Sequence, residues 1–69
     1  MVASPRQPLV SVVMIFLNAE TFIDEAIRSV LDQTYPAVEL LLCDDGSTDT
    51  STARAREWAR ARPNQVIYL

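Results

Sequence analysis

The sequence predicts an α/β fold, with elements in the order β-α-β-α-β and a parallel three-stranded sheet. Three short apolar runs, at residues 9–17, 38–43 and 66–69, predict the strands. Two segments whose apolar residues recur at helical spacing lie between these runs. Strands that alternate with helices favour a parallel sheet joined by right-handed crossovers. The 69 residues allow one small domain at most.

The first strand is predicted from LVSVVMIFL at residues 9–17, a nearly continuous apolar run rich in β-branched residues. Such a run is typical of a strand that is buried on both faces. In this strand order it also forms an edge of the sheet, and an apolar edge invites pairing with another chain. Residues 1–8 precede the strand, contain two prolines and are expected to form a flexible leader.

The first helix is predicted to follow Asn18, which can cap it. Six apolar residues then share one helical face: Phe22, Ile23, Ala26, Ile27, Val30 and Leu31. Glu20, Asp24 and Glu25 fill the first turns, where the helix dipole favours negative charge. Arg28 lies four residues after Asp24, a spacing that allows a weak surface ion pair.

The second strand is predicted from VELLLC at residues 38–43 and is also expected to be buried on both faces. It ends at an acidic turn, DDGS, at residues 44–47. Gly46 permits a sharp turn with a positive φ angle. Ser47 or Thr48 can then cap the second helix.

The second helix is expected to run to about Arg62, because Pro63 and Asn64 stop it. It carries four of the six basic residues: Arg54, Arg56, Arg60 and Arg62. We interpret them as a solvated helix face, because no aromatic residues alternate with them as a single-strand nucleic-acid site requires. The net charge of −3 also argues against a broadly basic nucleic-acid-binding protein. Trp58 is predicted to pack in the core.

Composition excludes several classes of site. One cysteine and no histidine rule out a disulfide framework, a Cys/His zinc site and a Ser-His or Cys-His catalytic pair. Cys43 lies inside an apolar run and is expected to be an inert buried thiol. A single glycine excludes G-x-G-x-x-G and P-loop motifs. No apolar stretch approaches the roughly 20 residues of a membrane span, so we predict a cytoplasmic protein.

Candidate functional residues follow the first two strands. In open parallel sheets, ligands bind beyond the carboxyl ends of the strands, which here are residues 16–18 and 44–47. Asp44 and Asp45 are adjacent and should point in opposite directions, so at most one faces a given ligand. A carboxylate at this place can accept hydrogen bonds from a base or a ribose, or approach a metal. A turn that only joins strand to helix, with no ligand, remains an open alternative.

The segment VSVVMIFLNAETFIDEAIRSVLDQTYPAVELLLCDDGSTDTS resembles the N-terminal signature of family 2 glycosyltransferases, which are enzymes of the GT-A fold. The resemblance covers about residues 9–69. It combines a VSVV strand that ends in Asn18, a helix that ends in SVLDQTYP, and the strand and turn ELLLCDDGSTD. Each part is a weak signal alone, but their combination in this order is specific.

The resemblance implies transfer of a sugar from a nucleotide-sugar donor to a glycan, lipid or protein acceptor, usually with Mg²⁺ or Mn²⁺. It also implies that the Rossmann-like strands form the first portion of a nucleotide-sugar-binding fold. By its place in the motif, Asp45 corresponds to the carboxylate that contacts a uracil-type base. The other residues that the resemblance assigns to the nucleotide pocket are Asp44, Ile15, Leu17, Asn18 and Gly46. Ile15 and Leu17 replace residues that are often Pro or Thr and Tyr in the family, which limits them to backbone contacts and apolar packing.

Several parts of the family pattern are missing. The metal-binding D-x-D motif of the family does not occur in this sequence, and the catalytic base and the acceptor-binding half come later in the family. We therefore expect residues 9–69 to be the N-terminal portion of a glycosyltransferase domain, cut before its metal site, and inactive in isolation. A complete protein of this kind could work at the cytoplasmic face of a membrane.

Two other classes of protein stay open. A small non-catalytic α/β interaction module could use the apolar edge strand to pair with another chain, including a second copy of itself. A receiver-type domain with an acidic turn is the weakest alternative, because such a domain needs a lysine and this sequence has none.

Overall fold

The computed structural model describes residues 8–33 and 37–69. Five elements follow one another along the chain: β1 (Val10–Phe16), α1 (Ile23–Leu31), β2 (Val38–Asp44), α2 (Ser51–Ala61) and β3 (Val66–Tyr68). This order confirms the predicted β-α-β-α-β arrangement. Residues 1–7 of the expected leader lie outside the described residues. No helix in the described part of the chain is long and apolar enough to cross a membrane.

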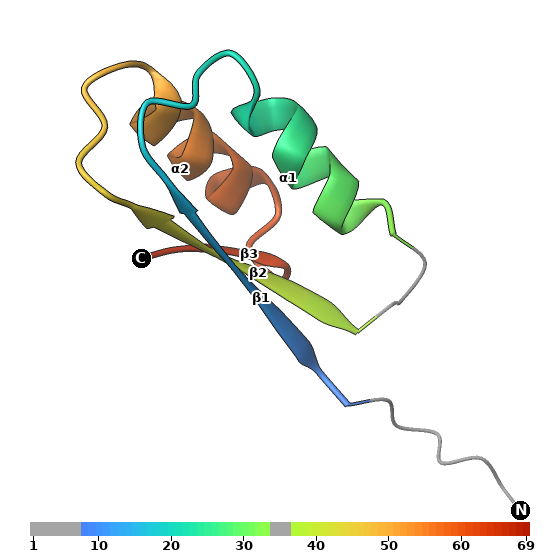
Figure 1. The fold of residues 1–69 in the computed structure, drawn as a ribbon. Coiled ribbons are helices and arrows are strands. Elements are labelled where there is room, and N and C mark those ends of the chain that lie inside the picture. The colour runs from blue at the N-terminus through green and yellow to red at the C-terminus, as the bar shows by residue number, and fades with distance from the viewer. Residues whose placement is uncertain (1–7, 34–36) are drawn as a thin grey trace, which may run out of the picture.

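The three strands form one parallel sheet in the order β1-β2-β3, which confirms the predicted α/β class (Figure 1). β1 pairs with β2 along its whole length, from Val10 opposite Val38 to Phe16 opposite Asp44. The shorter β3 pairs with the middle of β2. Because all strands run in the same direction, the loops that follow β1 and β2 lie side by side at one end of the sheet.

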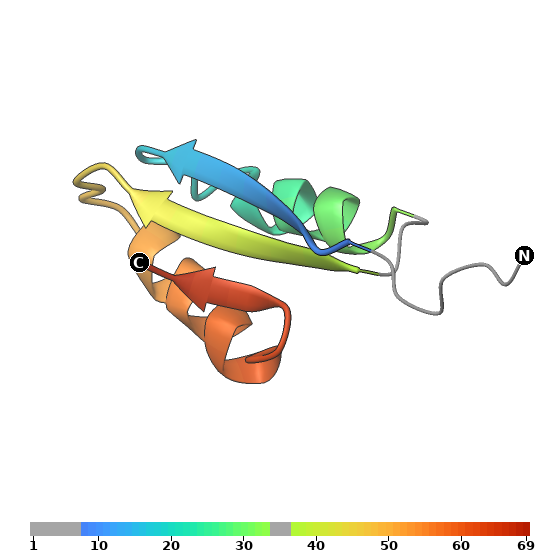
Figure 2. The same ribbon diagram turned by 90° about the horizontal axis from the view of Figure 1, so that it is seen from below.

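Both helices cover the same face of the sheet (Figures 1 and 2). The strand order advances in one direction, and successive right-handed crossovers then place both helices on one side. The core lies between this face and the helices, and its buried members are Phe16, Ala19, Ile23, Ile27, Leu40, Leu42, Ala55 and Val66. Trp58 packs against this core at its margin, as the sequence predicts.

The opposite face of the sheet corrects the sequence analysis. Side chains alternate along a strand, and those of Val13, Ile15 and Ile67 are 56%, 71% and 38% exposed on this face. The expectation that β1 is buried on both faces is therefore wrong for the residues that the structure describes. Cys43, which shares this face, is half-buried rather than fully buried.

The predicted helix caps are also wrong. α1 begins after Phe22, which makes no capping hydrogen bond through its side chain and is 58% exposed. α2 begins after Thr50, and neither Ser47 nor Thr48 caps it. The polar groups of Asn18 and Ser47 instead form hydrogen bonds with each other's loop. Contacts between distant segments have replaced the local caps that the sequence suggested.

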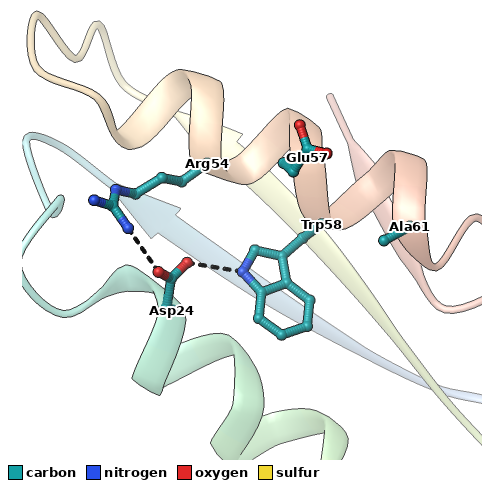
Figure 3. A pocket seen from close by; sticks show the side chains of 5 residues that line it. All are labelled: Asp24, Arg54, Glu57, Trp58 and Ala61. Carbon is teal, nitrogen blue, oxygen red and sulfur yellow. Dashed lines mark hydrogen bonds and ion pairs between the residues drawn. The ribbon is translucent and has the colours of Figure 1, made fainter.

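Asp24 joins the two helices rather than pairing with Arg28. Its carboxylate accepts hydrogen bonds from Trp58 Nε1 at 2.9 Å and from an Arg54 guanidinium nitrogen at 2.7 Å (Figure 3). Arg54 and Trp58 lie one turn apart on α2, so both reach the same carboxylate. The guanidinium of Arg28 lies over the Trp58 ring instead, 5.6 Å from its centroid. A shallow pocket of about 230 Å³ lies beside this contact, lined also by Glu57 and Ala61.

Candidate functional site

Two loops meet at the carboxyl end of the sheet. The first loop (residues 17–22) follows β1, and the acidic loop (residues 45–50) follows β2. The parallel pairing of β1 with β2 continues into the loops, because the Asp45 N–H donates to the Phe16 carbonyl oxygen at 2.9 Å. The structure thus brings two candidate segments together that are about 30 residues apart in sequence.

The side chain of Asp44 stabilises the acidic turn by accepting hydrogen bonds from the turn and from neighbouring elements. Its Oδ1 accepts hydrogen bonds from the N–H groups of Gly46 at 3.2 Å and Ser47 at 2.8 Å. Its Oδ2 accepts from the hydroxyl groups of Thr52 and Tyr68. These bonds, chiefly those from Thr52 and Ser47, lower the pKa of Asp44 to about 2. Both carboxylate oxygens of Asp44 thus accept hydrogen bonds within the protein.

Asp45 has the opposite environment. Its side chain is exposed, and no described residue forms a hydrogen bond or an ion pair with its carboxylate. Gly46 follows with a φ angle of +97°, which confirms the predicted positive φ and turns the chain sharply away from the strand. Adjacent residues of one motif therefore do different things: Asp44 holds the turn, and Asp45 presents a charged acceptor to solvent.

Asn18 connects the two loops. Its N–H donates to Ser47 Oγ at 3.0 Å, and its Oδ1 accepts from the Thr48 N–H at 2.8 Å. Its φ angle of +50° lies in the left-handed region, which asparagine tolerates better than most residues. Asn18 therefore lies beside the acidic turn and is held there by these bonds, not as a helix cap.

A second set of contacts between the loops was missed by the sequence analysis. Glu20 Oε1 accepts from both the N–H and the hydroxyl of Thr50 at 2.9 Å. The Glu20 N–H donates to Asp49 Oδ2 at 3.2 Å. The Ala19 N–H donates at 2.6 Å to Oγ of Ser51, a fully buried side chain. The only sequence signal was an acidic residue shortly before each helix, which predicted nothing about the other loop.

Ile15 and Leu17 offer apolar surface and no side-chain hydrogen-bonding group. Their side chains are 71% and 54% exposed. Both line a groove of about 290 Å³ next to the N-terminal end of α1, together with Phe22 and Ala26. The structure is thus compatible with apolar packing at these two positions, which is the role the resemblance left to them.

The described residues do not offer a site for Mg²⁺ or Mn²⁺. Within residues 8–33 and 37–69, no group of three or more His, Cys, Asp or Glu side chains is placed to hold a metal ion. Asp44 and Asp49 flank the turn, and their oxygens already accept hydrogen bonds within the fold. Among the described residues of the turn, this leaves the Asp45 carboxylate without such bonds.

The fold belongs to the class of open parallel α/β sheets, in which ligands bind beyond the carboxyl ends of the strands, and the Asp45 carboxylate lies at that end. The family model of glycosyl transferase family 2 matches residues 11–69. The chain belongs to glycosyl transferase family 2. No solved structure matches the chain significantly.

Three relatives are informative. An "Uncharacterized glycosyltransferase" of Haemophilus influenzae is 46% identical over 50 residues, which cover 72% of this chain and 16% of the relative. The "Putative glycosyltransferase EpsE" of Bacillus subtilis is 46% identical over 62 residues, 90% of this chain and 22% of the relative. The "UDP-Glc:alpha-D-GlcNAc-diphosphoundecaprenol beta-1,3-glucosyltransferase WfgD" of Escherichia coli is 46% identical over 54 residues, 78% of this chain and 21% of the relative. The chain spans about a fifth of the length of these curated relatives.

Proposed function

We propose that the protein carrying this chain transfers a sugar from a nucleotide-sugar donor to an acceptor. In this proposal residues 9–69 are the N-terminal, nucleotide-binding portion of its catalytic domain. The observation that carries it is the contrast within the acidic turn. Asp44 is fully engaged, whereas the neighbouring Asp45 is exposed and has no partner among the described residues. A charged acceptor held on a rigid turn is suited to bind a donor group of a ligand.

In the proposed complex, Asp45 accepts a hydrogen bond from an N–H of a uracil-type base. Ile15 and Leu17 pack against the nucleotide with apolar surface, because they have no polar side-chain atoms. Asp44, Gly46 and Asn18 contribute by shaping the turn and holding it against the first loop. The name of the Escherichia coli relative, which includes UDP-Glc as the donor, supports a uridine nucleotide as the first one to test.

The remaining parts of the proposal concern the whole protein. We place the main ligands of the implied Mg²⁺ or Mn²⁺ outside this chain, because the D-x-D motif of the family does not occur in its sequence. The acceptor is a glycan, a lipid or a protein. The Escherichia coli relative is named for an undecaprenol-linked acceptor, which supports work at a membrane face, and we place that work on the cytoplasmic side.

The test compares two carboxylates of the protein at its natural length. Asp45→Asn removes the free charge at the turn, and Asp32→Asn is the matched control, an exposed carboxylate at the far end of α1. Transfer and hydrolysis are measured with a panel of nucleotide sugars and Mn²⁺. Asparagine keeps a neutral oxygen acceptor, and a hydrogen bond to a charged group contributes about 1.5–3 kcal/mol against about 1 kcal/mol for a neutral one, so Asp45→Asn should lower kcat/KM about 2- to 30-fold. Asp32→Asn should leave kcat/KM unchanged. Equal activity in both variants, or no reaction with any donor, would contradict the proposal.

A second candidate function is a non-catalytic interaction module. The observation that favours it is the apolar surface of β1, which forms an open edge of the described sheet and exposes Val13 and Ile15. Such an edge can pair with a second copy of the chain. Sedimentation of the 69-residue chain separates the two functions. A discrete, folded dimer supports the module, whereas aggregates or a poorly folded monomer support a portion of a larger enzyme.

A further inference from the structure

We propose that Glu20 and Asp49 form a latch between the first loop and the acidic loop, and that this latch positions Asp45 for the nucleotide. The two residues are positioning residues, because their carboxylates bind the protein and not the ligand. This inference rests on the function proposed above. It goes beyond that function by assigning a role to two residues that the family motif does not place in the nucleotide pocket.

The latch is reciprocal. Glu20 in the first loop accepts the N–H and the hydroxyl of Thr50 in the acidic loop, both at 2.9 Å. Asp49 in the acidic loop accepts the N–H of Glu20 at 3.2 Å. The first N–H groups of a helix lack partners within the helix, and α2 receives no side-chain cap from its own N-cap residue. Glu20 therefore supplies from the other loop an acceptor at the N-cap of α2.

A buried serine fixes the acidic side of the latch. The N–H and the hydroxyl of Ser51 both donate to Asp49 Oδ1, so this carboxylate cannot rotate freely. Ser51 Oγ in turn accepts the Ala19 N–H, one residue before Glu20. Burial acts to raise the pKa of Asp49, but the bonds from Ser51 and Glu20 outweigh it and lower the pKa below its usual value. Asp49 is therefore charged at neutral pH and is a strong acceptor.

Asn18 connects the latch to the turn that holds Asp45. It precedes Ala19 and Glu20 in the chain, and it binds Ser47 and Thr48 in the acidic loop. The acidic loop is thus attached at Asp45 to the end of β1, in its middle to Asn18, and at its far end to the latch. Removing the Glu20 carboxylate releases Thr50 and leaves only the bonds of Asn18, of the Ala19 N–H and of the Glu20 N–H between these parts of the two loops. The turn that presents Asp45 then has greater freedom to move.

The experiment uses Glu20→Ala, Glu20→Gln and a matched control, Ile27→Val, in the protein at its natural length. Glu20→Gln keeps an oxygen that can accept from Thr50. Ile27→Val lowers stability by trimming the buried core beneath α1 and touches no hydrogen bond of either loop. Two quantities are measured: the Kd for UDP, and the hydrogen-exchange rate of residues 44–50 without ligand.

We expect Glu20→Ala to weaken UDP binding about tenfold, since small displacements of a binding group carry penalties of this order or more. The same variant should exchange residues 44–50 faster, and Glu20→Gln should restore most of both properties. Ile27→Val should change neither. Wild-type affinity in Glu20→Ala, unchanged exchange at residues 44–50, or an equal loss in Ile27→Val would overturn the latch.

A parallel measurement on Asp45→Asn separates this inference from the proposed function. If Asp45→Asn loses affinity for UDP and Glu20→Ala does not, the latch is wrong and the proposed nucleotide site stands. If the wild-type protein does not bind UDP, or if Asp45→Asn binds it equally well, the proposed site is wrong. The exchange rates without ligand then decide whether Glu20 holds the acidic loop.

Discussion

Replacement of Ser51 by alanine tests whether the two loops are joined as described. Ser51 is fully buried, and its Oγ accepts a 2.6 Å hydrogen bond from the N–H of Ala19, itself a buried residue. The variant leaves that N–H without a partner. A buried donor without a partner destabilises a protein by about 1–3 kcal/mol. Alanine favours a helix over serine by at most about 0.7 kcal/mol, so the net loss should be about 1–2 kcal/mol.

The assay compares Ser51→Ala with Ser29→Ala by urea unfolding and by hydrogen exchange of the Ala19 amide. Ser29 is the matched control because it is an exposed helical serine whose hydroxyl donates only to the Glu25 carbonyl of its own helix. Its replacement should change stability by less than about 0.5 kcal/mol. Ser51→Ala should also speed exchange at Ala19. If both variants are equally stable and the Ala19 amide stays protected, the hydrogen bond from Ala19 to Ser51 does not join the two loops.

Three further changes test the turn and the contact between the helices. Gly46→Ala places a side chain at φ +97°, and although the space around it is open, the backbone strain should lower stability by about 1–2 kcal/mol in urea unfolding. Asp24→Ala should lower the free energy of unfolding by about 1 kcal/mol. The loss is modest because the Asp24 side chain is about one third exposed, so solvent screens its ion pair with Arg54. Urea unfolding measures this loss, and faster hydrogen exchange of the Trp58 indole N–H shows that its bond to Asp24 is gone. Hydrogen bonds lower the pKa of Asp44 in the folded protein to about 2, so the charged carboxylate stabilises the fold above its ordinary pKa of 3.8 and this stabilisation is lost as pH falls toward 2. Between these two pH values, the stability of Asp44→Asn should therefore change less with pH than that of the wild-type protein.

The order and class of the elements could be predicted because apolar patterning records them. The runs at residues 9–17, 38–43 and 66–69 became the three strands, and the helical spacing of Ile23 and Ile27 placed both in the core. The burial of β1 could not be predicted in the same way. A continuous apolar run means that burial of either face is favourable, but it does not show which residues cover each face, and the described helices cover only one.

The acidic turn was predictable in outline for a local reason. Neighbouring residues at a strand end point to opposite sides, so the sequence alone predicts different environments for Asp44 and Asp45. The contacts of Asn18 and Glu20 were not predictable, because their partners lie 29 or 30 residues away in sequence. Local rules offered each residue a role near a helix start, and hydrogen bonds between the loops replaced both.

We propose that a nucleotide binds at the exposed carboxylate of Asp45. Backbone chemical-shift mapping of the isotope-labelled protein during a UDP titration tests it most directly. We expect the largest shifts at residues 45–47 and at Leu17 and Asn18, with little change at the Trp58 indole N–H in the pocket between the helices. Shifts that centre on Trp58 and Asp24, with residues 45–47 unmoved, would contradict it.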